Sequence, residues 1–403
     1  MSPHIRYLRI GLPVMAWSGV VLAATYRSHT PAVFGRYSWG YLTALLVLVG
    51  GALLFTLGKV TWYQALYRAR AGLAISGVSL LLAVGVLELG IRLVDPFGIS
   101  YYEQIGRYTR DKVADDHLVF RHKPLSQARY GHVLVTYNEQ GLRDRPIAKK
   151  ATGEYRILAL GDSVTFGWGV DQDKTFAARL ESFLPSRLHR PVRVINSGVG
   201  GYNTVQEVVY FMREGLTLQP DLVILTYVEN DIEALSPTHL SGLVATSNQG
   251  MSPLGTVPAL VGKLWLYRLA NHTYNYGSQR ASPQRSMTAA RESVGWRQSM
   301  AALHELVTIC NERRIPLMVF FERTRKTEET TTLLQDVARN APGIPVVDMA
   351  PWYAGVDAQQ FMNSKIDRQP NAEGHRLMAE HMAIDIVRSM NMASPTTILA
   401  GQR

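Results

Sequence analysis

The sequence is poor in cysteine and in charge. One cysteine, Cys310, occurs in 403 residues, which excludes a disulfide framework and a cysteine-ligated zinc site. Charged residues make up 18% of the chain and hydrophobic residues 47%, so it is neither a disordered tail nor a coiled coil. No Gly-rich phosphate loop, metal-ligand cluster or repeat stands out, so we expect no cofactor and no metal.

The net charge of +10 is unevenly distributed. Residues 1–97 hold eight Lys and Arg but two acidic residues, Glu88 and Asp95. A protein that binds nucleic acid would concentrate its basic residues in a folded domain. Here most of the excess flanks apolar segments, which indicates membrane topology and argues against nucleic acid as a partner.

Three apolar stretches in residues 1–97 predict an anchor of about three transmembrane helices, with spans at 10–26, 37–58 and 71–90. Each is close to the roughly 20 residues that cross bilayer hydrocarbon as a helix. The first span is short and has Pro13 in its first turn, so a signal peptide is the alternative for it. The other two spans would still anchor the protein.

Positive charge in the short loops predicts the orientation. Five basic residues lie on one side of the predicted membrane and three on the other: Arg6, Arg9, Lys59, Arg68 and Arg70, against Arg27, Arg36 and Arg92. This bias places the N-terminus in the cytoplasm and everything after residue 95 outside. We therefore expect a protein of the bacterial inner membrane with a periplasmic C-terminal domain.

The third span carries a stripe of small residues: Gly72, Ser76, Ser79, Ala83 and Gly90. Small residues at this spacing let membrane helices approach closely. Two interpretations stay open, namely packing among the chain's own helices and docking onto another membrane protein.

Two further features near the membrane also have two interpretations each. Glu88 and Arg92, four residues apart, form either an ordinary helix pair at the interface or an intramembrane functional carboxylate. The aromatic, mildly basic segment Leu260–Tyr276 is either a core or lid helix, or a segment that rests on the membrane surface or on a partner.

Residues 151–392 alternate apolar strands with helices. The predicted strands are 156–160, 192–196, 222–228, 316–321 and 344–349, and the predicted helices include 296–313 and 372–390. This alternation predicts an α/β domain whose parallel sheet has helices on both faces and whose site lies at the carboxyl ends of the strands. A lead-in segment (98–150) precedes the domain, an irregular insertion (about 235–290) interrupts it, and a polar tail (393–403) follows it.

Four polar blocks follow these strands. They are GDSVTFGWGV (Gly161–Val170), NSGVGGYN (Asn196–Asn203), VEND (Val228–Asp231) and IDRQPNAEGH (Ile366–His375). In this order they resemble the SGNH/GDSL hydrolase family, and the preceding VTYNEQGLRD (Val135–Asp144) resembles the lead-in of a membrane-anchored bacterial branch. The resemblance covers roughly 130–390. It implies a flavodoxin-like sheet and, in active members, hydrolysis of carboxylic esters or acetylated sugars.

The resemblance also implies roles for individual residues. Ser163 would be the nucleophile, and Asp367 would belong to the catalytic set. The amides of Ser163 and Gly201 and the side chain of Asn230 would bind the oxyanion. A serine hydroxyl also needs a nearby base, and these residues do not supply one.

The base position departs from the family pattern, because Gln369 stands just before Pro370 where the catalytic His is expected. A glutamine amide neither accepts nor returns a proton at ordinary pH. Three interpretations stay open. The domain is a degenerate hydrolase; another group, with His375 as the candidate, replaces the base; or a histidine was replaced by variation or to trap a substrate. Val228 also stands where the family usually has Gly.

The sequence therefore predicts a membrane-anchored, extracytoplasmic SGNH-like domain that is catalytically degenerate. It would act as an accessory or scaffold subunit of a membrane assembly, an energy-transducing assembly being one candidate. Its partners would be other membrane proteins, bound through the transmembrane helices and the 235–290 insertion. The alternative is a membrane-anchored serine ester hydrolase or sugar O-deacetylase that uses Ser163 with an unconventional base on an acyl or acetylated-sugar substrate.

Overall fold

The computed structural model of the chain describes residues 45–50, 60–96, 98–233, 264–270, 293–323 and 327–393. The chain divides into two compact units. The first, here called the anchor unit, comprises residues 1–99 and 245–283. The second, here called the globular unit, comprises residues 100–244 and 284–403.

The anchor unit contains the long helix α3 (Val60–Val94). Its segment Tyr67–Val94 has a mean hydropathy of 2.1 and is the one helix among the described residues that is long and apolar enough to span a membrane. Only 6% of its most apolar window is buried, whereas the core helix of a soluble protein would be mostly buried. The predicted span 10–26 lies outside the described residues, and span 37–58 is described only at 45–50, which are helical.

Helix α3 is longer than the span predicted at 71–90. The residues before position 71 were expected to form a loop. For residues 60–70 this prediction is wrong, because the helix already begins at Val60. The segment from Gln64 to Ala71 contains Gln, Ala, Leu and Arg and lacks Gly and Pro. These residues favour helix, so nothing in this stretch ends it.

The globular unit is built on a five-stranded parallel sheet, which confirms the predicted α/β fold. Its strands are β5 (Tyr155–Gly161), β6 (Val192–Asn196), β7 (Leu222–Tyr227), β8 (Leu317–Phe321) and β9 (Val346–Asp348). Their spatial order is β6-β5-β7-β8-β9, and every neighbouring pair is parallel. This is the flavodoxin-like order 2-1-3-4-5, whose direction reverses between β5 and β7.

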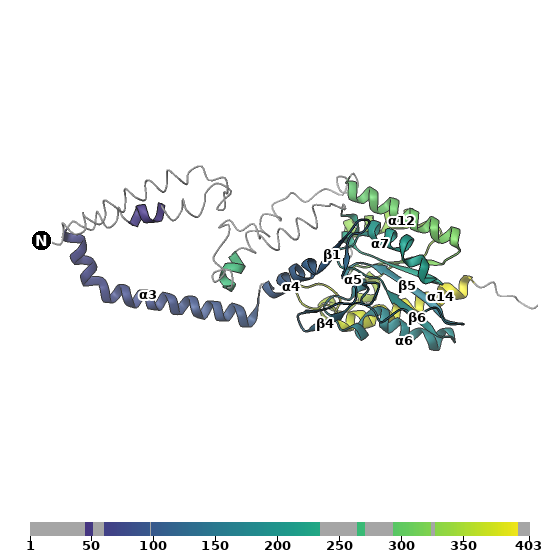
Figure 1. Cartoon of the computed structure of the whole chain (residues 1–403), viewed down its shortest axis with the longest axis horizontal. Coiled ribbons are helices and arrows are strands. Elements are labelled where there is room, and N and C mark those ends of the chain that lie inside the picture. Colours follow the sequence, from purple (N-terminus) through teal and green to yellow (C-terminus); the bar gives the residue numbers. More distant parts are fainter. Residues whose placement is uncertain are drawn as a thin grey trace, which may run out of the picture. The chain divides into compact units, whose positions relative to one another are not determined.

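Helices cover both faces of this sheet (Figure 1). One apolar core joins alternate strand residues such as Leu158 and Val223 to helices α7 (Thr204–Arg213), α12 (Val294–Arg313) and α13 (Glu328–Asn340). The other core joins the intervening residues, such as Ile157 and Ile224, to α6 (Phe176–Leu188) and α14 (Ala372–Ala393). A sheet buried on both faces requires the continuous apolar runs seen in the sequence.

The lead-in segment is more structured than expected. It forms helix α4 (Ile99–Arg110) and two antiparallel hairpins, β1–β2 (Lys112–Asp115, Val119–His122) and β3–β4 (Gln127–Tyr130, Val133–Thr136). Tyr108 and Tyr130 pack with Phe166 and Trp168 in a third apolar cluster. The lead-in therefore packs against the loop that follows β5.

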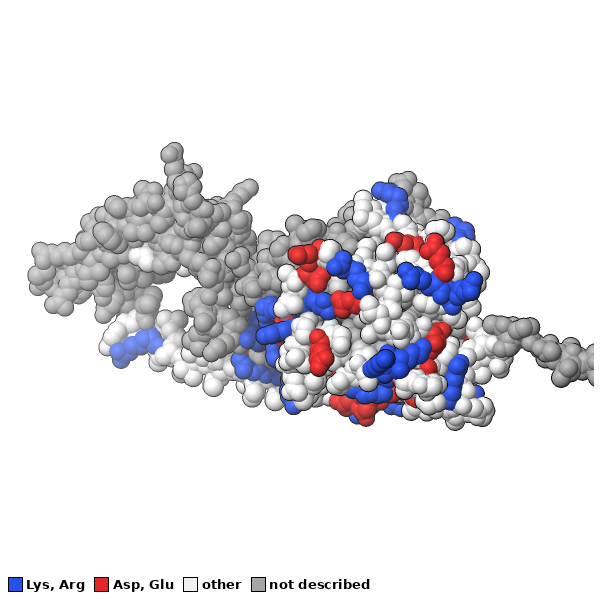
Figure 2. Space-filling model, turned by 45° about the vertical axis from the view of Figure 1, so that its right-hand side comes forward, with Lys and Arg blue, Asp and Glu red and all other residues white. Residues whose placement is uncertain are grey.

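Short helices complete the globular unit. They are α5 (Ser163–Phe166), η1 (Gln172–Lys174), η2 (Gly215–Leu218), η3 (Glu229–Ile232), η4 (Ala350–Tyr353) and η5 (Ala358–Phe361). On the face shown in Figure 2, basic and acidic side chains are interspersed over this unit. Local ion pairs, such as Arg376 with Glu380 and Arg388 with Asp385, account for part of this mixture.

Candidate active site

Ser163 and Asn230 lie beside the point where the strand order reverses. Ser163 begins α5 directly after β5, and Asn230 lies in η3 directly after β7. These two strands are hydrogen-bonded neighbours, with Gly161 opposite Thr226 at their carboxyl ends. In open α/β sheets this switch point is where ligands bind.

Asp162 connects the two residues. Its Oδ2 accepts hydrogen bonds from Ser163 Oγ at 3.0 Å and from Asn230 Nδ2 at 3.3 Å. Its Oδ1 accepts from the backbone N–H of Val164 at 2.9 Å, so the same carboxylate caps α5. Asp162 is buried, and burial raises its pKa while these hydrogen bonds oppose the rise. Sequence reasoning did not single out Asp162, although it adjoins the serine.

Gln369 contacts the serine directly. Its Nε2 donates a hydrogen bond to Ser163 Oγ at 2.9 Å. Its backbone N–H donates to Asp367 Oδ1 at 3.1 Å, and the other oxygen of Asp367 accepts from Asn363 Nδ2 at 3.1 Å. Burial raises the pKa of Asp367 to about 6. Ser163 thus accepts from the side-chain amide of Gln369 and donates to the carboxylate of Asp162, while Asp367 holds the backbone of Gln369.

His375 is engaged elsewhere. It lies in the first turn of α14 and is fully buried. Its Nδ1 accepts a hydrogen bond from the backbone N–H of Phe176 at 3.1 Å, and its ring stacks on the Phe176 ring. Burial lowers the pKa of His375 to about 3, so the ring is neutral and held by α6. Within the described part of the chain, the hydrogen bonds of Ser163 Oγ go to Asp162 and Gln369 instead.

The second block packs backbone to backbone against the first. Asn196 Nδ2 donates to the carbonyl oxygen of Thr165 at 2.8 Å, and Asn196 Oδ1 accepts from the N–H of Gly198 at 3.0 Å. A Cβ added to Gly198 would lie 2.2 Å from the backbone nitrogen of Phe166. Only glycine permits this approach, which brings the Asn196–Asn203 loop beside α5.

Two lead-in residues hold the backbone N–H and the backbone carbonyl of Gly200, the residue before Gly201. The N–H of Gly200 donates to Tyr108 Oη at 2.8 Å, and Lys112 Nζ donates to the Gly200 carbonyl oxygen at 2.5 Å. The peptide group between Gly200 and Gly201 is planar and trans, so the Gly200 carbonyl points opposite to the N–H of Gly201. The direction of the Gly201 N–H is therefore fixed by Lys112. Neither lead-in residue was predicted, because they are 88 and 92 residues from Gly200.

Lys112, on β1, is a half-buried amine beside this loop. Its Nζ lies 4.4 Å from the centre of the Tyr108 ring and 4.1 Å from that of Phe120. Burial lowers the pKa of Lys112 to about 7, and the charge of Asp162 partly opposes this shift. Lys112 therefore lies close to its protonation midpoint at neutral pH.

The Tyr108 hydroxyl belongs to a buried chain of hydrogen bonds. His122 Nδ1 lies 3.1 Å from the Gly141 carbonyl oxygen, which can only accept, so Nδ1 carries the proton. His122 Nε2 then accepts from the Tyr108 hydroxyl at 2.7 Å. That leaves the Tyr108 oxygen as acceptor for Gly200. Both ring nitrogens of His122 are therefore engaged in hydrogen bonds.

The lead-in motif GLRD (Gly141–Asp144) supports both the Gly161–Val170 block and the Asn196–Asn203 block. Arg143, which is 1% exposed, donates to the carbonyl oxygens of Phe166 (3.0 Å), Gly167 (2.5 Å) and Val170 (2.5 Å). The neighbouring Asp144 accepts from the backbone N–H of Asn196 at 2.9 Å. The motif was quoted from the sequence, but its role as a support for the first two blocks was not predicted.

Two further carboxylates are buried behind Asp162. Glu207 on α7 and Asp231 in η3 are 2% and 0% exposed. Both carboxylate oxygens of Glu207 lack a hydrogen-bond partner among the described residues. Burial raises the pKa of both carboxyls; the charge of Asp231 adds to the rise at Glu207, and the charge of Asp162 adds to the rise at Asp231.

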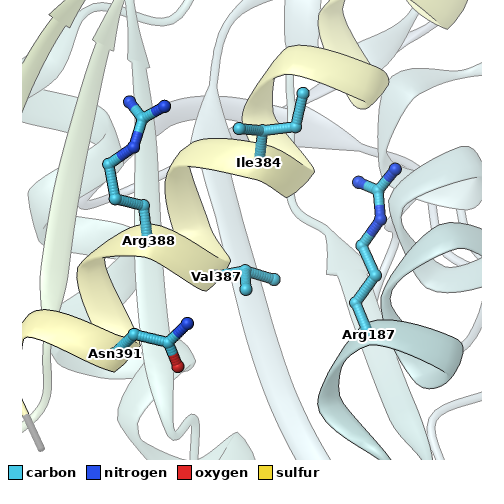
Figure 3. A pocket seen from close by; sticks show the side chains of 5 residues that line it. All are labelled: Arg187, Ile384, Val387, Arg388 and Asn391. Atoms are coloured by element: carbon cyan, nitrogen blue, oxygen red, sulfur yellow. The ribbon is translucent and has the colours of Figure 1, made fainter.

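The described residues contain no group of three or more His, Cys, Asp or Glu that could hold a metal ion. A cavity of about 610 Å³ lies between the later turns of α6 and α14 (Figure 3). Arg187 and Arg388 border an apolar floor that includes Ile384 and Val387. None of its lining residues belongs to the four blocks, so the cavity is separate from the candidate site.

Residues 159–377, more than half of the chain, match the model of the GDSL-like Lipase/Acylhydrolase family. The chain therefore belongs to this family, as the four blocks indicate. No curated protein matches the chain.

Similar solved structures include a two-domain esterase active on acetylated mannans, with 16% identity and a TM-score of 0.37. The match covers 59% of this chain but only 51% of that one. An acetyl xylan esterase (11% identity, TM-score 0.35) is matched over 57% of this chain and 99% of its own length. A mutant of an acetyl-xylooligosaccharide esterase from Geobacillus Stearmophilus has 14% identity and a TM-score of 0.37, with coverage of 59% and 96%. At these values the structures carry no argument about substrate.

Proposed function

We propose that this chain is a membrane-anchored SGNH-like protein that no longer hydrolyses esters and serves as an accessory subunit of a membrane assembly. The observation that carries the proposal is the hydrogen bond from Gln369 Nε2 to Ser163 Oγ at 2.9 Å. In this proposal Gln369 occupies the place of the family's histidine. A base must come within about 2.6–3.2 Å of the hydroxyl, and here that place is filled by an amide that cannot take a proton.

The environment of His375 supports this interpretation. A substitute base would need a lone pair directed at Ser163 and a pKa near the working pH. His375 directs Nδ1 to the Phe176 amide, and burial keeps its pKa at about 3. Its use as a base would require α14 to leave α6, which would open the second core.

In this proposal α3 is the anchor, the globular unit lies in the periplasm of a bacterium and the N-terminus lies in the cytoplasm, as the loop charges predict. Membrane partners would contact the small-residue stripe of α3 and the 235–290 insertion. A protease-accessibility map of spheroplasts tests the topology. Cleavage of the globular unit only after the membrane is opened would contradict it.

The decisive experiment treats the detergent-solubilised full chain with a fluorophosphonate probe, which reacts with activated serines. We expect no labelling of the wild-type chain, and we expect it to co-purify in stoichiometric amount with other membrane proteins. Labelling that disappears in Ser163→Ala would overturn the proposal. An active family member serves as the positive control for the probe.

One observation favours a second function, an ester hydrolase or sugar O-deacetylase with an unconventional base. Ser163 Oγ donates to Asp162 Oδ2 at 3.0 Å, and burial raises the pKa of Asp162. A carboxylate of raised pKa could accept the serine proton during attack on an acyl or acetylated-sugar substrate. The same probe separates the two functions, because labelling abolished by Asp162→Asn would support this one.

A further inference from the structure

Glu88 is a partly covered carboxylate on a largely exposed apolar helix. Its neighbours on α3 are open, with Val84, Leu87 and Leu89 exposed by 43%, 54% and 57%. The Glu88 side chain is exposed by only 14%. Something within the anchor unit covers this side chain, and the hydrogen bonds identify it.

The cover is a segment of the insertion that lies far away in sequence. The backbone N–H of Trp265 donates to Glu88 Oε1 at 2.8 Å, and that of Leu266 donates to Oε2 at 2.9 Å. Arg92 Nε also donates to Oε1, at 2.9 Å. Both carboxylate oxygens are therefore satisfied, as a charge in apolar surroundings requires. Residues 245–283 also cluster with residues 1–99 in one compact unit, as this contact requires.

The same contact also provides hydrogen-bond acceptors for backbone N–H groups of the insertion. Residues 265–270 are helical, and the N–H groups in the first turn of a helix have no carbonyl partner within it. Glu88 accepts from two of these groups. Neither the carboxylate nor the two amides need water, so the contact can exist outside the aqueous phase.

The composition of the covering segment suits an interface between lipid and water. Residues 264–270 read LWLYRLA, with one charge, Arg268, among apolar and aromatic residues. Trp and Tyr concentrate at the headgroup level of bilayers, and short amphipathic segments lie there with apolar side chains in the acyl region.

The position of Glu88 along α3 also corresponds to the interface between lipid and water. At 1.5 Å per residue, the 28 residues of Tyr67–Val94 extend about 42 Å, against a hydrocarbon core of about 30 Å. A centred span then leaves about 6 Å at each end in the headgroup region. Glu88 is six residues before Val94, or about 9 Å, which places it about 3 Å inside the hydrocarbon boundary.

We propose that residues 264–270 are a second membrane-contacting element, embedded in the outer interfacial layer of a phospholipid bilayer beside α3 and held there by Glu88. This inference rests on the proposed membrane anchoring by α3. It is independent of whether Ser163 is active. It assigns residues 264–270 to lipid rather than to a lid over the site or to a protein partner, and it leaves the rest of the 235–290 insertion for the proposed membrane partners.

The test uses the full chain in liposomes of phosphatidylcholine and phosphatidylglycerol. A fluorophore is attached to Leu264→Cys, an exposed position at the start of the segment, in a Cys310→Ala background. The matched probe position is Leu125→Cys, which is 76% exposed in the globular unit. Nitroxides fixed at a shallow depth in the lipid should quench the label at 264 several-fold more than the label at 125.

The variant Glu88→Ala should lose most of that difference, whereas Glu305→Ala, which removes a carboxylate from an exposed position of α12, should keep it. Both variants should still float with the liposomes, because the span remains. Loss of flotation would instead refute the anchor itself. Equal quenching at 264 and 125 would overturn the proposal. If position 264 were then shielded in native membranes but not in liposomes, the segment would be assigned to a protein partner instead. Unchanged quenching in Glu88→Ala would overturn the role of Glu88.

Discussion

Replacing Gln369 by histidine should create an esterase if the rest of the site is intact. Gln and His both place Nε2 four bonds from Cα, so a histidine at 369 can reach Ser163 Oγ, where the Gln369 Nε2 now lies at 2.9 Å. Asp367 already accepts from the backbone N–H of residue 369. A carboxylate in this place can orient an imidazole and stabilise its protonated form.

A positioned general base contributes about 10²–10⁴-fold, so we expect Gln369→His to raise the rate of ester hydrolysis by at least about 10²-fold over the wild-type chain. The gain should depend on pH. The reaction needs a neutral imidazole and an ionised Asp367, and burial places the pKa of Asp367 at about 6. The activity should therefore fall as the pH drops through about 6.

The assay is hydrolysis of p-nitrophenyl acetate by the detergent-purified full chain, with Gln369→Ala as the matched variant and Ser163→Ala in the Gln369→His background as the control. Activity that survives the loss of Ser163 would arise elsewhere. A folded Gln369→His chain with no gain would refute the reasoning, because it would mean that Gly201 and Asn230 do not present their N–H groups to an oxyanion.

Two further predictions concern stability of the globular unit. Arg143→Met should lower the free energy of unfolding by about 3 kcal/mol or more, because three buried carbonyls lose their donor. Arg145→Met should cost less than about 1 kcal/mol, because the Arg145 side chain that pairs with Glu181 is exposed. Equal losses in thermal or urea unfolding would contradict the supporting role of Arg143. The pKa of His375 is about 3 when folded and about 6.5 when unfolded, so between these values the unfolded chain binds more protons and stability falls as the pH falls. His375→Asn should flatten that slope between pH 6.5 and 4, and an unchanged slope would show that the ring is not held neutral.

The sheet could be predicted because each central strand is a continuous apolar run. Strand β6 matches its predicted bounds, and β5, β7, β8 and β9 differ by one or two residues at their ends. Helix α13 was missed because its sequence is polar and buries few apolar side chains, Leu333 and Val337 among them. The four-residue strands of the lead-in were missed because they are too short to show a clear alternation.

In the candidate site, too, some residues could be predicted from the sequence and others could not. The residues that follow strand ends were accessible to sequence reasoning, because topology alone brings the carboxyl ends of parallel strands together. Lys112, Tyr108 and Arg143 were not, because their partners are backbone carbonyl and amide groups that carry no sequence signature. A cation that binds a carbonyl 88 residues away becomes visible only in three dimensions.

The contact between the lead-in and the loop after β5 has a practical consequence for the boundaries of the protein. The family match begins at residue 159, yet the compact unit begins at Ser100. A fragment cut at the family boundary would lose the donor to the Phe166 carbonyl and the aromatic cover of Trp168. Any soluble fragment intended for crystallisation or partner screening must therefore start ahead of α4, close to the end of α3.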